Sequence, residues 1–87
     1  MSQLNLAEEY LDFLDGPIWY SIVGFIRFDA TVRRRSLLTS TNMTEQQRYG
    51  HIYALGTYKS LCTKIYDAAG RKLPPELLEL FTGDAKE

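Results

Sequence analysis

The sequence predicts an all-α fold in which two long helices, at about residues 17–38 and 45–69, form an antiparallel hairpin. Shorter helices at about 5–15 and 75–82 flank it. A dense apolar segment, PIWYSIVGFIRF, begins at Pro17, and proline is favoured at the first position of a helix. Apolar residues also recur at helical spacing between 45 and 69. A polar loop of about five residues separates the two segments, a length typical of antiparallel neighbours.

The first short helix is predicted at residues 5–15. Asn5 and Glu8 have the spacing of a capping box, with Asn5 as the N-cap. Apolar residues then follow at helical intervals, and Gly16 is expected to end the helix. The short turn that follows predicts that this helix folds across the first long helix or projects from it at a sharp angle.

The first long helix has two adjacent apolar stripes. One contains Ile18, Ile22, Phe25, Ile26 and Asp29, and the other contains Trp19, Val23, Ile26, Ala30, Arg33 and Leu37. Its first half is apolar almost all round, so we expect it to need partners on more than one side.

The second long helix is predicted from a capping box at its start, formed by Thr44 and Gln47. Its apolar stripe consists of His51, Ala54, Leu55, Tyr58, Leu61, Cys62, Ile65, Ala68 and Ala69, and Gly70 is expected to end it. Gly50 and Gly56 inside this helix each cost about 1 kcal/mol relative to alanine. They are either tolerated or mark a close approach of another helix.

The last helix is predicted after Pro74 and Pro75, with an apolar edge of Leu77, Leu78 and Phe81. A helix this short is unstable alone, so it must dock onto something. The two alternatives are a groove beside the first long helix of its own chain and a neighbouring subunit, and we favour the neighbour. We expect one small helical domain at residues 1–83 and a polar tail at 84–87.

Composition argues against several classes of protein. The chain has 87 residues, one cysteine, one histidine and a formal net charge of −1. Cys62 alone cannot form an intramolecular disulfide, and one histidine with one cysteine cannot supply a four-ligand zinc site. No signal peptide is evident, and the apolar run 18–26 is about half of a bilayer span. We expect no transmembrane segment, no catalytic, metal or cofactor-binding residues, and no enzymatic activity.

His51 is interpreted as a core or interface histidine, because its spacing places it on the packed stripe. Cys62 is interpreted as a small buried hydrophobic residue, because no acidic residue or histidine lies three or four positions away. The cluster Arg33–Arg35 raises a different question. These arginines either interact with the carbonyl groups at the end of the helix or contact phosphates or acidic groups of a partner. The residues assigned to such contacts are Arg27, Arg34, Arg35 and Lys64.

Three short motifs give the chain a resemblance to known proteins, which bears on its function. Pro17 and Trp19 open one helix as P-x-W, the motif G-x-I-x-A-L lies at residues 50–55 of the second, and Leu73–Pro74 follows its end. Over residues 17–74 the chain resembles small helical-hairpin proteins encoded among the head and structural genes of tailed bacteriophages. This resemblance implies a virion or assembly component that is made in the host cytoplasm and becomes associated with the virion.

We therefore predict a non-enzymatic structural or accessory protein that binds itself, other virion proteins or both, as a homo-oligomer. The predicted protein-interface residues are Ile18, Trp19, Ile22, Phe25, Leu77, Leu78 and Phe81. For Trp19 the sequence leaves two alternatives, a place in the core and a place in an interface. The alternative is a small nucleic-acid-associated regulator that binds phosphates through the Arg33–Arg35 region.

Overall fold

The computed structural model describes residues 3–82, which form four α-helices and no strand. The helices are α1 (Gln3–Leu14), α2 (Pro17–Thr39), α3 (Glu45–Ala68) and α4 (Pro75–Phe81). The prediction of an all-α fold is confirmed. The predicted tail at 84–87 and the last residue of the predicted domain lie outside the described residues.

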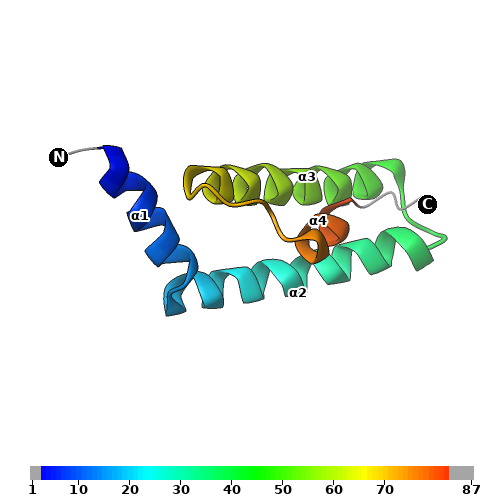
Figure 1. Cartoon of the computed structure of the whole chain (residues 1–87). Helices are drawn as coiled ribbons and strands as arrows, with labels where there is room; N and C mark the ends of the chain where they lie inside the picture. The colour runs from blue at the N-terminus through cyan, green and yellow to red at the C-terminus, as the bar shows by residue number, and fades with distance from the viewer. Residues whose placement is uncertain (1–2, 83–87) are drawn as a thin grey trace.

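The two long helices lie side by side and run in opposite directions (Figure 1). The short helix α4 contacts both of them, and α1 packs against one end of the pair. The extents are 53 × 21 × 20 Å. The two long helices account for about 35 Å of the length, because each residue adds about 1.5 Å to a helix, and α1 lies at one end of the pair (Figure 1).

Local sequence signals explain most of the helix ends. Pro17 occupies the first turn of α2, after Gly16 as the N-cap. At the start of α3 the Gln47 backbone N–H donates to Thr44 Oγ1 at 3.1 Å, and the Thr44 N–H donates to Gln47 Oε1 at 3.0 Å. These two hydrogen bonds confirm the predicted capping box of α3. After the end of α3, Gly70 adopts a φ of 76°, which glycine tolerates best.

The start of α1 differs from the prediction. The helix includes Gln3, so Asn5 lies inside it and is not its N-cap. The two residues before Asn5 in the helix, a glutamine and a leucine, are both good helix formers. They extend the helix beyond the cap that the spacing of Asn5 and Glu8 had suggested.

The core forms where α2, α3 and α4 meet. Its buried residues come from all three helices and are Trp19, Ile26, Ala30, Leu37, Leu55, Cys62, Leu77 and Phe81. Of the two predicted stripes of α2, the structure buries the one that contains Trp19 and Leu37. The other stripe, which begins at Ile18, remains exposed apart from Ile26, a member of both, and the partly buried Asp29.

Candidate protein-interaction surface

Three of the predicted interface residues lie in the core of their own chain. Trp19, Leu77 and Phe81 are 3%, 1% and 3% exposed. The Trp19 ring packs 5.6 Å from the ring of Phe13 and 6.3 Å from that of Tyr66, measured between centroids. Side chains already covered within the chain offer no surface to another one. The interface assignments of Leu77 and Phe81 are therefore corrected, and of the two alternatives for Trp19 the structure has the core.

The docking of α4 explains the correction. Phe81 lies 6.1 Å from Tyr58 of α3 between ring centroids, and Glu76 pairs with Arg27 of α2 at 3.0 Å. The helix therefore covers its own core, and the preference for a neighbouring subunit was wrong for Leu77 and Phe81. The neighbouring residue Leu78 lies on a different side of α4 from Leu77 and remains 39% exposed.

Apart from Leu78 of α4, the remaining predicted interface residues are exposed and belong to one stripe of α2. We call this set, extended by one residue that the sequence reasoning omitted, the α2 stripe: Ile18, Ile22, Phe25 and Val32, with exposed fractions of 65%, 38%, 77% and 45%. Single exposed apolar residues are common on proteins, but a contiguous row of large ones marks an interaction surface. Its i, i+4, i+7 spacing would have revealed Val32 to sequence reasoning.

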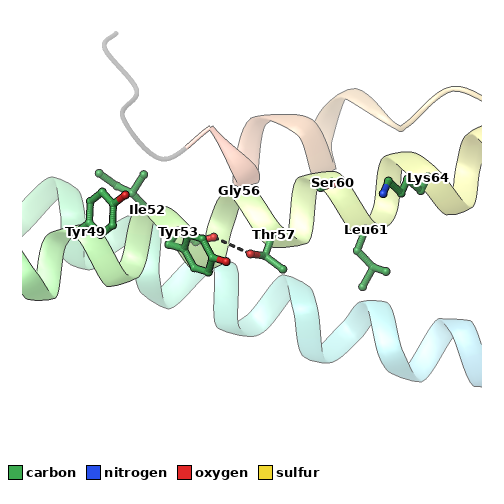
Figure 2. Close-up of a pocket in the computed structure, with 8 residues that line it drawn as sticks. All are labelled: Tyr49, Ile52, Tyr53, Gly56, Thr57, Ser60, Leu61 and Lys64. Atoms are coloured by element: carbon green, nitrogen blue, oxygen red, sulfur yellow. Dashed lines mark hydrogen bonds between the residues drawn. The ribbon is translucent and has the colours of Figure 1, made fainter.

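The exposed surface of α3 carries a shallow hollow, whereas that of α2 carries a row of large apolar side chains. The hollow is lined by Tyr49, Ile52, Tyr53, Gly56, Thr57, Ser60, Leu61 and Lys64 (Figure 2). Three of its lining residues, Gly56, Thr57 and Ser60, are small, and Leu61 points from α3 toward α2. A Cβ atom added at Gly50 or Gly56 would meet no atom within 4 Å. Packing within the chain therefore does not require either glycine.

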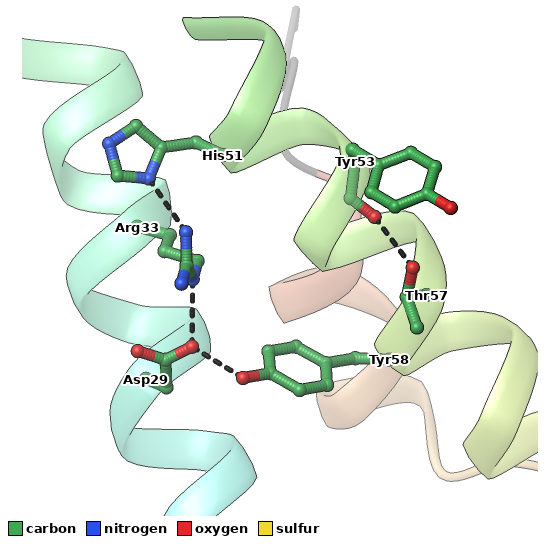
Figure 3. A network of polar contacts seen from close by, with 6 residues as sticks. All are labelled: Asp29, Arg33, His51, Tyr53, Thr57 and Tyr58. Carbon is green, nitrogen blue, oxygen red and sulfur yellow. Dashed lines mark hydrogen bonds and ion pairs between the residues drawn. The ribbon is translucent and has the colours of Figure 1, made fainter. Parts of the chain in front are cut away.

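A polar cluster joins α2 to α3 (Figure 3). Arg33 Nε donates to Asp29 Oδ2 at 2.7 Å, and the hydroxyl of Tyr58 donates to the same oxygen. Arg33 Nη1 lies 3.2 Å from His51 Nδ1, which can accept a hydrogen bond when the imidazole is neutral. Sequence reasoning placed His51 in the packed stripe but missed these partners, because they come from another helix.

The contacts explain the pKa directions in this cluster. The hydrogen bond from Tyr58, and then that from Arg33, hold the pKa of Asp29 below its ordinary value. The same bond to Asp29 raises the pKa of the Tyr58 hydroxyl, and the bond between Asp29 and Arg33 raises the pKa of the guanidinium. All three groups are thus stabilised in the protonation states that bind one another. This arrangement is that of a structural clamp between two helices.

The predicted phosphate-binding residues do not line one site. Arg27 pairs with Glu76, while Arg34 and Arg35 line a small hollow with Leu80 of α4. Lys64 instead lines the hollow on α3. The Arg34 Nε–H is buried and finds no acceptor among the residues that the structure describes.

Cys62 is fully buried between the helices, and burial raises the pKa of its thiol to about 11. Such a thiol is protonated near neutral pH and is a poor nucleophile. Within residues 3–82 no group of three or more His, Cys, Asp or Glu residues is placed to hold a metal ion. None of the helices in this part of the chain has the length and apolarity needed to cross a membrane.

Comparisons of the chain with protein-family models, curated proteins and solved structures find no match.

Proposed function

We propose that this chain is a non-enzymatic structural or accessory protein that acts in multiple copies through its uncovered apolar surface. The observation that carries the proposal is the α2 stripe, where Phe25 is 77% exposed although Trp19 on the same helix is 3% exposed. Leaving such side chains in water forgoes roughly 1.5–3 kcal/mol each. A binding partner would recover this free energy.

The chemistry of the polar groups supports the non-enzymatic part of the proposal. The single histidine contacts Arg33, whose guanidinium is also paired with Asp29. The single thiol is enclosed and has a raised pKa. General acid–base or nucleophilic catalysis needs such groups to be free and to face a substrate.

The setting we propose is a bacteriophage virion or its assembly, and this part rests on the sequence resemblance over residues 17–74. In that setting the α2–α3 hairpin serves as a rigid scaffold, with α4 closing one of its faces. Repeated copies of one small scaffold suit a virion, since closed assemblies reuse one interface many times.

Light scattering with a hydrophobic dye tests the proposal. We expect the purified chain at micromolar concentration either to have a mass above that of one chain or to bind the dye through the α2 stripe. Phe25→Glu should reduce whichever signal is present. Tyr20→Glu is the matched control, because Tyr20 is equally exposed at 79% but lies on another side of α2. A strictly monomeric chain that binds no dye would contradict the proposal.

A nucleic-acid-associated regulator is the second candidate, favoured by Arg34 and Arg35. The Arg34 Nε–H has no acceptor among the described residues, and Arg35 is exposed beside it. Phosphate contacts predict binding to DNA or RNA that weakens by about 0.9 log unit per contacted phosphate for each tenfold rise in salt. Binding that does not depend on salt, or none at about 50 mM salt, would exclude it.

A further inference from the structure

We propose that a second copy of this chain covers the face of the α2–α3 pair opposite α4. In the resulting symmetric dimer, the α2 stripe of each copy packs on α3 of the other. This inference rests on the proposed function and names the partner: a chain identical to the first.

The contacts of α2 locate this face. Asp29 bonds to Tyr58 of α3, whereas Arg27 pairs with Glu76 of α4, so these two residues mark different sides of α2. The residues of the α2 stripe lie 11, 7 and 4 positions before Asp29 and 3 positions after it. In an α-helix all four of these separations return to the same face, so the stripe lies on the same side of α2 as Asp29. It therefore lies next to α3 and away from α4.

Residues of α3 complete the same face. Gly50, Ala54, Thr57 and Leu61 are separated by 4, 3 and 4 positions. Leu61 points toward α2 (Figure 2) and is 47% exposed. The other three residues share its side of α3 by helical spacing, so the row lies along the edge of α3 that faces α2. The α2 stripe has the same spacing, through Ile18, Ile22, Phe25, Asp29 and Val32. Alternating intervals of 3 and 4 are typical of the seams along which helices pack in coiled coils and four-helix bundles.

The two rows are complementary in size. The α2 row carries large side chains, and most of the α3 row is small: a glycine, an alanine and a threonine. A two-fold axis can place the large row of each copy against the small row of the other, so that both contacts form together. The only charged group in either row, Asp29, is already paired within its own chain.

The available area is sufficient for a dimer. Taking roughly 200 Å² for a fully exposed large apolar side chain, the α2 stripe and Leu61 expose about 500 Å² per copy. Two copies would bury about 1,000 Å² from these side chains alone, which is close to the area that a specific interface has to exceed. The small residues and the rim would add to this area.

Sedimentation equilibrium over about 1–100 μM tests the dimer. We expect the unmodified chain to reach the mass of two chains and not to exceed it, because a two-fold contact closes on itself. Phe25→Glu and Gly50→Leu should each raise the dissociation constant about tenfold or more, by placing a charge or a bulky group in the seam. Helix content measured by circular dichroism should remain unchanged, because neither position is packed within the chain.

Two matched variants serve as controls. Tyr20→Glu adds the same charge on another side of α2. Gly56→Leu adds the same side chain to α3, six positions after Gly50 and therefore on a different side of the helix. A leucine at either glycine begins from a Cβ that meets no atom within 4 Å. Both controls should leave the dimer intact.

Three outcomes would overturn the inference. A monomer whose dye binding falls in Phe25→Glu would reject the second copy but leave the proposed interaction function in place. Mass that keeps growing with concentration would indicate head-to-tail contacts and not a two-fold dimer. If Gly50→Leu and Gly56→Leu raised the dissociation constant equally, the dimer contact would not lie on the side of α3 that contains Gly50.

Discussion

The two faces of the α2–α3 pair differ in what covers them. On one face, α4 contributes Leu77 and Phe81, each at most 3% exposed, to the common core. On the opposite face, Phe25 and Ile18 are exposed although they are as apolar as the residues of the core. Hydrophobicity therefore does not distinguish the two faces, and the position of one short helix does. The covered face stabilises the fold, while the uncovered face is available for association.

The largest expected effect comes from Trp19, on the covered side of α2. Trp19→Ala should lower the free energy of unfolding by about 3–5 kcal/mol, because it removes a ring enclosed by Phe13 and Tyr66. Denaturant unfolding of Trp19→Ala and the control Tyr20→Ala provides the measurement. The neighbouring Tyr20 is 79% exposed, so its variant should change stability by less than about 0.5 kcal/mol. Similar losses for both would mean that the two sides of α2 are not distinct.

A second comparison uses adjacent leucines of α4. Leu77→Ala should cost about 2–5 kcal/mol, since Leu77 is 1% exposed, and Leu78→Ala should cost clearly less at 39% exposure. Thermal unfolding monitored by circular dichroism distinguishes them. If Leu77→Ala retained full stability but lost self-association, α4 would be a connector between copies, and the intrachain docking would be wrong.

Gly56 tests an exposed side of α3 that belongs to neither of the two faces. Gly56→Ala should stabilise the chain by up to about 1 kcal/mol, because alanine has the higher helix propensity and the added Cβ meets no atom within 4 Å. Gly70→Ala should instead destabilise it by about 1–2 kcal/mol, since Gly70 has a φ of 76°. Chemical denaturation of the two variants gives the signs. A loss of stability at Gly56 would show that something packs there.

The smallest effect is expected at the clamp between α2 and α3. Because the folded pKa of Asp29 lies below its ordinary value of 3.8, its contribution to stability is present above about pH 4. It is lost as the pH falls below that value toward the folded pKa. The pair is partly exposed, so we expect less than about 1 kcal/mol. Between pH 7 and 2 the free energy of unfolding should fall less steeply with decreasing pH in Asp29→Asn than in the unmodified chain. An unchanged slope would show that Asp29 does not cause the loss of stability at low pH.

Local sequence patterns predicted the elements well and their contacts less well. The ends of α2 and α3 lie within one residue of their predicted positions, because Pro17, the Thr44 capping box and Gly70 act within a few residues of the chain. The start of α1 was missed, because the helix continues beyond the capping signal at Asn5. The α2 stripe was recognised as an apolar row, but helical spacing alone could not decide whether it or the row of Trp19 would be buried.

The sequence by itself determined that the chain is helical, where its long helices begin and end, and that α2 has more apolar surface than one neighbour can cover. These properties depend on residues a few positions apart, whose periodicity and capping hydrogen bonds are independent of the rest of the fold. Only the tertiary structure decided that Trp19, Leu77 and Phe81 lie in the core and that Phe25 remains exposed. The reason is that burial depends on which faces of α2 are covered by the other helices: α1 and α3 contact Trp19. The docking of α4 joins segments about 50 residues apart, as the pair of Arg27 and Glu76 shows.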